Sequence, residues 1–223
     1  MGQPGSYYFP YESKQHPSTN VPDMEDGRKG DYLTDALTDK AINFIEEQGG
    51  QGEQPFFLNF WYYTVHTPII PDNTKLKKYM QKAKAMGLNE RGKDGVRDHK
   101  SFSRREQSSA AYACMVESMD QNIGRIMSTL KNKGMDKNTI IVFLSDNGGL
   151  STGPGSNMPT SNMPLRAGKA WVYEGGIRSP LIISYPAGIK AGLEVSQPAV
   201  STDIYPTLLD LAGIPLRPQQ HVD

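Results

Sequence analysis

The chain has 223 residues, and its 24 Lys and Arg side chains balance 24 Asp and Glu side chains, which gives zero formal net charge. This length suits one α/β domain or a large part of one, and the balanced charge argues against nucleic-acid binding, which needs a basic face. The apolar runs are far too short to span a membrane. The single cysteine, Cys114, excludes an internal disulfide and a cysteine-rich zinc site.

Apolar periodicity predicts helices at several places along the chain. The first 30 residues are aromatic but have no period, so we expect a loop segment there. Apolar residues recur at spacings of three and four over 32–47 and 104–132, which predicts two amphipathic helices. A shorter helix is expected around 74–86, and a last helix is expected over 202–211.

Apolar runs at 55–61, 140–144 and 181–185 predict strands. The run at 140–144 contains no polar residue, which predicts a strand buried on both faces of a mostly parallel sheet, with helices on both faces. The order of helices and strands is typical of α/β folds built from βαβ units. Residues 72–103 are rich in charge and weakly periodic, so we expect a surface excursion within one domain over 1–223.

Polar residues follow two of the predicted strands at their carboxyl ends, where ligands bind in open α/β sheets. Asp146 and Asn147 come directly after the run at 140–144, and their oxygen atoms suit Ca²⁺ or Mg²⁺. His66 lies beyond the run at 55–61 and is a candidate general acid or anion-binding donor. The alternatives are an ordinary turn for Asp146 and Asn147, and a histidine hydrogen-bonded within a proline-bounded loop for His66.

A loop at 150–167 leads into a segment that combines glycines with charge. Loops of this length without secondary structure are usually functional or mobile. In the segment that follows, the glycines permit close approach of the backbone, and Lys169, Glu174 and Arg178 supply charge.

Three stretches, in this order and spacing, resemble the type I sulfatases of the alkaline phosphatase superfamily, of the arylsulfatase and N-acetylgalactosamine-sulfatase kind. They are Val65-His66-Thr67-Pro68, Leu144-Ser145-Asp146-Asn147-Gly148, and Gly168-Lys169 with Tyr173-Glu174-Gly175-Gly176-Ile177-Arg178-Ser179-Pro180. The resemblance covers nearly the whole chain, although residues 72–103 match poorly. It implies an α/β, alkaline-phosphatase-like catalytic domain.

The resemblance also implies a sulfuric ester hydrolase that uses one divalent cation, usually Ca²⁺. In the family, the aspartate and asparagine that correspond to Asp146 and Asn147 bind the metal. The histidine matching His66 contacts the sulfate or protonates the leaving oxygen, and the lysine matching Lys169 contacts the sulfate and the leaving group. These residue types suit an ester that is already ionised, because they stabilise negative charge and protonate the leaving group.

Other parts of the family pattern do not occur in this sequence. The family nucleophile is a formylglycine made from Cys or Ser in a Cys/Ser-x-Pro-x-Arg motif, and the run at 162–166 has asparagine at the first position, which cannot become the aldehyde. The early paired aspartates and a Gly-Lys-x-His stretch are also missing, and all of these lie upstream in the family. We therefore expect an incomplete, C-terminal portion of a sulfatase catalytic domain, with the formylglycine in a missing N-terminal part. We interpret Glu174 and Arg178 as partners that fix the loop carrying Lys169.

Two other functions stay open at this point. One is a phosphoesterase or phosphonate hydrolase of the same superfamily, although Asn147 stands where the two-zinc enzymes tend to place histidine. The other is a non-catalytic glycan-binding module. We expect the chain alone to be inactive and to bind metal weakly, the substrate to be a sulfated small molecule or glycan, and the parent protein to be exported, whether periplasmic, lysosomal or secreted.

Overall fold

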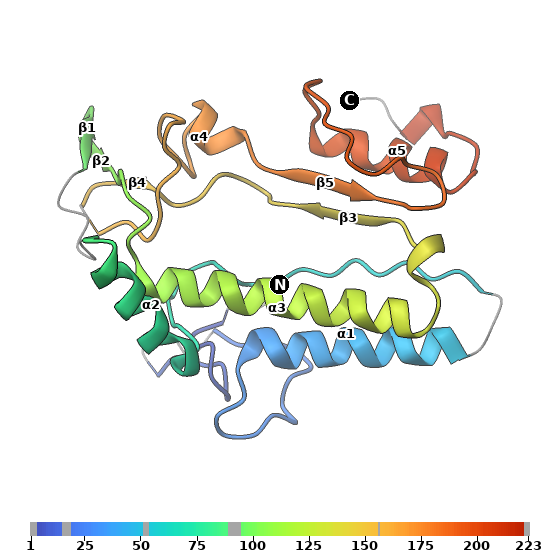
Figure 1. Ribbon diagram of the computed structural model, residues 1–223, viewed down its shortest axis with the longest axis horizontal. Helices are drawn as coiled ribbons and strands as arrows, with labels where there is room; N and C mark the ends of the chain where they lie inside the picture. The colour runs from blue at the N-terminus through green and yellow to red at the C-terminus, as the bar shows by residue number, and fades with distance from the viewer. Residues whose placement is uncertain (1–3, 15–18, 51–53, 89–94, 156, 221–223) are drawn as a thin grey trace.

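The computed structural model describes the chain except residues 1–3, 15–18, 51–53, 89–94, 156 and 221–223. Its helices are α1 (Leu33–Gly50), α2 (Asn73–Ala85), α3 (Ala110–Asn132), α4 (Glu174–Ile177) and α5 (Ile204–Leu211). Its strands are β1 (Val96–Asp98), β2 (Ser101–Ser103), β3 (Ile141–Leu144), β4 (Thr152–Gly153) and β5 (Leu181–Ser184). Figure 1 shows α1 and α3 side by side in one layer, β3 and β5 in the next, and α5 beyond the strands.

The core lies where the N-terminal segment packs against α1 and α3. Tyr7, Tyr11 and Met115 are almost fully buried there, together with Leu33 at the start of α1. The hydroxyl of Tyr7 donates a hydrogen bond to the carbonyl oxygen of Tyr63 (2.6 Å), so the polar end of this buried ring is satisfied. The aromatic residues thus hold a segment of little regular structure against the helical layer.

The four predicted helices are confirmed as α1, α2, α3 and α5, but α3 begins later than its periodicity indicates. Ser109 caps α3, because its side chain accepts a hydrogen bond from the backbone N–H of Tyr112. Arg104, which the sequence placed in the helix, lies before it, and its backbone N–H donates to the carbonyl oxygen of Ser151 (2.8 Å). This contact attaches the segment that precedes α3 to the loop that follows β3.

The strand pairings differ from the predicted mostly parallel sheet. β3 pairs with β5 in antiparallel register, from Ile141 opposite Ser184 to Leu144 opposite Leu181, and β1, β2 and β4 form a second antiparallel sheet. A parallel sheet is therefore not confirmed within the described residues. Nor is β3 buried on both faces, since Leu144 is 43% exposed. In the described part of the chain, β3 also has a partner along one edge only.

The predicted strand at 55–61 is extended but forms no ladder with any described strand. Its side chains alternate as in a strand, with Phe57 and Trp61 outward and 75% and 61% exposed. Side chains hold the stretch against α1 instead, through the contact between the rings of Phe44 and Phe56, with centroids 5.7 Å apart, and just beyond it through a hydrogen bond of 2.6 Å between the hydroxyls of Thr34 and Thr64. A run with strand periodicity becomes a strand only when a neighbouring backbone supplies the hydrogen bonds.

Residues 72–103 contain α2 and the hairpin of β1 and β2. Asp72 caps α2 by accepting from the backbone N–H of Thr74 (2.9 Å), and α2 packs against α3. The hairpin is joined to the rest of the fold by pairing of β2 with β4, which places it beside the loop after β3 (Figure 1). Among the described helices, none combines the length and the apolar character that a bilayer span requires.

Candidate functional site

The turn after β3 presents the two predicted metal-binding residues. The hydroxyl of Ser145 donates to the carbonyl oxygen of Asn147 (2.9 Å), which curls the backbone around Asp146. The hydroxyl of Ser179, just before β5, donates to the carbonyl oxygen of Ser145 (2.9 Å). The turn is therefore attached to both strands of the β3–β5 pair, with the Asp146 side chain exposed and the Asn147 side chain partly exposed.

Glycines bring this turn into backbone contact with the loop that carries Lys169. The backbone N–H of Gly148 donates to the carbonyl oxygen of Gly176 (2.9 Å), and that of Lys169 donates to the carbonyl oxygen of Gly149 (3.1 Å). A Cβ atom at Gly148 would overlap the carbonyl oxygen of Gly175, and one at Gly168 would overlap that of Gly149. Only glycine permits this approach, so the glycines bring the segment of Asp146 and Asn147 against the segment of Lys169.

Asn162 holds the same two loops together from within. Its side-chain nitrogen lies within hydrogen-bond distance of the carbonyl oxygens of Gly149 (2.8 Å), Gly175 (2.9 Å) and Ala167 (3.2 Å), and of the hydroxyl of Ser151 (3.0 Å). An amide nitrogen carries two N–H groups, so these acceptors share them. One side chain therefore joins the turn after β3, the residue before Gly168 and helix α4.

Arg166 attaches the Lys169 loop to the β1–β2 hairpin. Its Nε and Nη2 atoms each lie 2.9 Å from a carboxylate oxygen of Asp98, which is the paired geometry that the guanidinium group favours. The guanidinium also lies over the ring of Tyr173, 3.8 Å from its centroid. The hydrogen bond from Arg166 lowers the pKa of Asp98 below its usual value.

The side chains of Asp146, Asn147 and Lys169 form no ion pair or hydrogen bond with any residue that the structure describes. A carboxylate, an amide and an ammonium group are thus presented on adjoining loops without partners among the described residues. Hard oxygen atoms of this kind suit Ca²⁺, which takes about six to eight ligands. In the described part of the chain, however, no three His, Cys, Asp or Glu side chains gather into a metal site, so these residues fit only part of a coordination shell.

His66 lies at the surface, after the extended stretch that begins at 55–61 and packs against α1. The hydroxyl of Tyr7, whose single proton is shared with the carbonyl oxygen of Tyr63, lies 3.0 Å from the carbonyl oxygen of His66 and holds its backbone, while the His66 side chain is exposed. Its Nδ1 atom lies 2.9 Å from the carbonyl oxygen of Thr67, so a proton on Nδ1 would leave Nε2 available to a ligand. No hydrogen bond or ion pair within the described residues joins His66 to Asp146, Asn147 or Lys169.

Glu174 and Arg178 lie at the two ends of α4 and bond to each other. The Nη1 atom of Arg178 is 3.1 Å from a carboxylate oxygen of Glu174, and both side chains are mostly exposed. The side chains that visibly hold the Lys169 loop are Asn162 and Arg166, which sequence reasoning did not select. Asp98 is 68 positions from Arg166 and carries no local signal.

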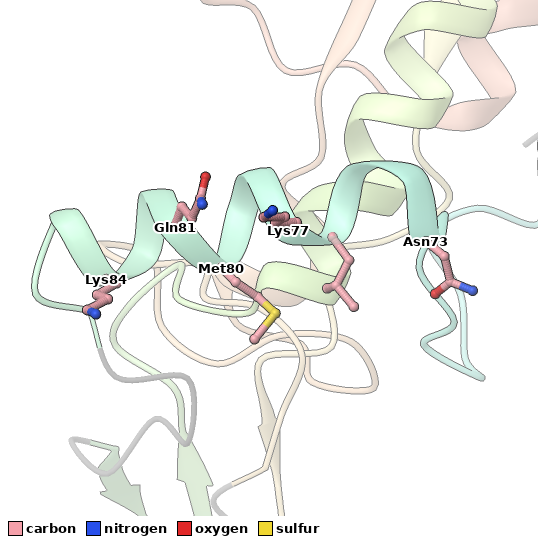
Figure 2. A pocket seen from close by; sticks show the side chains of 6 residues that line it. Asn73, Lys77, Met80, Gln81 and Lys84 are labelled. Atoms are coloured by element: carbon pink, nitrogen blue, oxygen red, sulfur yellow. The ribbon is translucent and has the colours of Figure 1, made fainter.

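Two surface hollows lie elsewhere. One, of about 470 Å³, runs along a single face of α2, and Figure 2 shows Lys77, Met80 and Lys84 among the side chains that line it. The other, of about 500 Å³, lies between the start of α1 and the start of α2. Neither hollow is lined by a residue that the sequence assigns to the site.

The family model described as Sulfatase matches residues 2–214. The chain belongs to the sulfatase family. A sulfatase of Formosa agariphila is 36% identical over 194 residues, which is 83% of this chain and 31% of that relative. The N-acetylgalactosamine-6-sulfatase of Mus musculus is 31% identical over 230 residues, or 96% of this chain and 38% of that relative.

A solved structure, that of Ps i-CgsB in complex with k-i-k-neocarrahexaose, is similar to the sulfatase chain with a TM-score of 0.68 and 30% identity, and the match covers 92% of this chain and 38% of that one. Structural likeness to sulfatases supports the alkaline-phosphatase-like fold. The chain thus spans between 31% and 38% of the length of these relatives.

Proposed function

We propose that the protein containing this chain hydrolyses sulfate esters, and that Asp146, Asn147, Lys169 and His66 form one part of its active site. The observation that carries the proposal is the backbone contact between the turn after β3 and the Lys169 loop. This contact presents an ammonium group and hard oxygen atoms on adjoining loops, and none of them is paired within the described part of the chain. Membership of the sulfatase family supports the same reaction.

The charged groups would divide the work of hydrolysis. The Lys169 ammonium would bind the anionic sulfate and stabilise negative charge that develops on the leaving oxygen. His66, as the imidazolium ion whose Nδ1–H is held by the carbonyl oxygen of Thr67, would give its Nε2 proton to that oxygen. Because an ester of this kind is already negatively charged, attack is favoured only where such positive groups are arranged in advance.

Asp146 and Asn147 would contribute two ligands to a divalent cation, which we expect to be Ca²⁺. When bound, the cation would neutralise charge on the sulfate oxygens. Two side chains supply a minority of the roughly six to eight ligands that Ca²⁺ takes, so the others must come from water, sulfate or the rest of the protein. The chain alone is therefore expected to bind Ca²⁺ weakly, and tight binding in a calorimetric titration would contradict this division of ligands.

The nucleophile is the part of the reaction that these 223 residues do not supply. We propose that a formylglycine lies in an N-terminal part of the same catalytic domain and that the present chain has no turnover without it. One edge of β3 and the stretch at 55–61 have no strand partner among the residues that the structure describes, which supports a domain completed by further strands. A parent protein exported from the cytosol remains our expectation.

The test is hydrolysis of an aryl sulfate and an aryl phosphate by the full-length parent, with and without Ca²⁺. Mass spectrometry of the same sample establishes whether formylglycine is present. We expect calcium-dependent turnover of the sulfate ester, with kcat falling about 100-fold or more in Lys169→Ala and His66→Ala. Lys77→Ala, on the exposed face of α2, is the matched control and should leave kcat unchanged.

Two results would contradict the proposal, and each would support a different function. Faster hydrolysis of the phosphate ester would indicate a phosphoesterase, which the neutral amide of Asn147 disfavours because two-zinc enzymes tend to place histidine there. No turnover, with no Cys or Ser upstream that can be modified, would indicate a glycan-binding module.

A further inference from the structure

We propose that Trp171 and Tyr173, together with the tip of the β1–β2 hairpin, bind a second, negatively charged sugar residue next to the sulfate ester. This inference rests on the proposed function for the identity of the neighbouring site, and it narrows the substrate class to sulfated oligosaccharides. Two independent features support it. One is an aromatic stack beside Lys169, and the other is a positively charged turn attached to that stack.

The aromatic stack begins two residues after Lys169. The rings of Trp171 and Tyr173 are stacked, with centroids 6.3 Å apart and planes inclined by 20°, and both side chains are partly exposed. Val172 between them is 86% exposed, so the backbone here lies at the surface. The face of an aromatic ring carries partial negative charge, which attracts the weakly positive C–H groups on the face of a sugar ring.

The stack is held rigid before any ligand arrives. The Arg166 guanidinium covers the Tyr173 ring at 3.8 Å and is itself fixed by two hydrogen bonds of 2.9 Å to Asp98. The backbone N–H of Trp171 donates to the carbonyl oxygen of Gly168 (3.0 Å), which fixes the start of the stack relative to Lys169. A surface fixed in advance loses little conformational entropy when a ligand binds, which favours affinity.

The hairpin tip supplies the charge that an anionic sugar requires. Asp98 is the one acidic residue between positions 95 and 103, and Arg166 neutralises it. The turn that follows consists of His99 and Lys100, both exposed, and the Lys100 ammonium has no ion-pair partner among the described residues. Lys100 is two residues along the chain from Asp98, whose carboxylate binds the Arg166 guanidinium that lies over the Tyr173 ring, so the turn and the aromatic stack are joined through one bridge.

The combination favours an oligosaccharide over a small aryl sulfate. A small sulfate ester would engage Lys169 and the turn after β3 but would not extend to the hairpin. A sulfated oligosaccharide carries a second anionic group one or two sugars away, and a sugar ring between the two charges would lie on the aromatic stack. Residues 72–103, which carry the hairpin, would then contribute to specificity.

The test is calorimetric binding of two hexasaccharides, from iota-carrageenan and from chondroitin 6-sulfate, to the full-length parent, with N-acetylgalactosamine 6-sulfate as the single-sugar probe. Mass spectrometry shows that each ligand stays intact during the titration. We expect at least one hexasaccharide to bind 10-fold or more tightly than the single sugar. Trp171→Ala should remove that preference, and Trp171→Tyr, which keeps an aromatic face, should retain most of it.

Lys100→Ala should weaken hexasaccharide binding several-fold and reduce its dependence on salt, whereas Lys77→Ala on α2 should change neither. The proposal is overturned if neither hexasaccharide binds more tightly than the single sugar, or if Trp171→Ala weakens all ligands equally. Failure of the proposed function appears differently. If the parent hydrolyses no sulfate ester but keeps hexasaccharide binding that depends on Trp171, the sugar site stands and the hydrolase assignment falls.

Discussion

The turn after β3 and the extended stretch before His66 both carry residues of the proposed site, but different interactions hold them. The turn is joined to the Lys169 loop by backbone hydrogen bonds, by glycines in direct contact and by the Asn162 amide. The extended stretch has no backbone ladder in the described part of the chain and depends on side-chain contacts with α1. The first region is fixed by this chain itself, whereas the second is open to further strands.

Gly148→Ala should disrupt the contact between the turn after β3 and the Lys169 loop, and it should have the largest effect on stability. The added Cβ would overlap the carbonyl oxygen of Gly175, and neither backbone can move without losing its hydrogen bonds. We expect the free energy of unfolding to fall by about 3 kcal/mol, measured by urea denaturation. Gly155→Ala is the control, because a Cβ there meets no atom within 4 Å. Equal stability of the two variants would contradict the close contact.

Asn162→Ala tests the side chain that connects the loops. The variant leaves the carbonyl oxygens of Gly149 and Gly175 with one partner fewer, so we expect a loss of about 2 kcal/mol in the free energy of unfolding. Asn157→Ala, at an exposed position in the same loop, should cost little. If both substitutions have the same effect, Asn162 does not hold these loops together.

Thr34→Val tests the second region, the extended stretch that leads to His66. It removes a buried hydroxyl that bonds to Thr64 while preserving shape, and a loss of about 1 kcal/mol is expected from urea denaturation. Thr129→Val is the control, since that exposed hydroxyl bonds only within its own helix. A cost larger than that of Asn162→Ala would show that the extended stretch is the better fixed region.

Acidification should separate the two regions, because only the Lys169 loop is tied by a carboxylate. The bond from Arg166 lowers the pKa of Asp98 in the folded chain, so the bridge stabilises the fold above the unfolded value of about 3.9. That contribution is lost as the pH falls through the lowered folded pKa. Pepsin cleavage within 162–178, followed by mass spectrometry, should accelerate over this range, and Asp98→Asn should remove the acceleration. An unchanged pH dependence in this variant would refute the role of the bridge.

Arg178→Ala should have the smallest effect. The pair with Glu174 is an exposed contact between the ends of a single helical turn, and such pairs contribute less than about 0.5 kcal/mol. The midpoint of thermal unfolding of the variant should therefore be close to that of the unsubstituted protein. A loss as large as that of Asn162→Ala would instead support the hypothesis that Glu174 and Arg178 fix the Lys169 loop.

Periodicity predicts α1, α2, α5 and most of α3, and the order of the motifs indicates the family. These are local properties, since helical periodicity and motif spacing depend on residues close together in the chain. The sequence also placed Asp146 and Asn147 after an apolar strand, where the structure has them.

The strand partners and the contacts that fix the Lys169 loop could be seen only in the three-dimensional structure. Strand direction depends on which backbone lies alongside, which is why β3 pairs antiparallel with β5 and the run at 55–61 forms no ladder with a described strand. The Asp98–Arg166 bridge spans 68 positions, and the Asn162 amide acts on carbonyl oxygens that have no side-chain signature. Contacts of this kind arise from the approach of distant backbones, which no local pattern in a single sequence encodes.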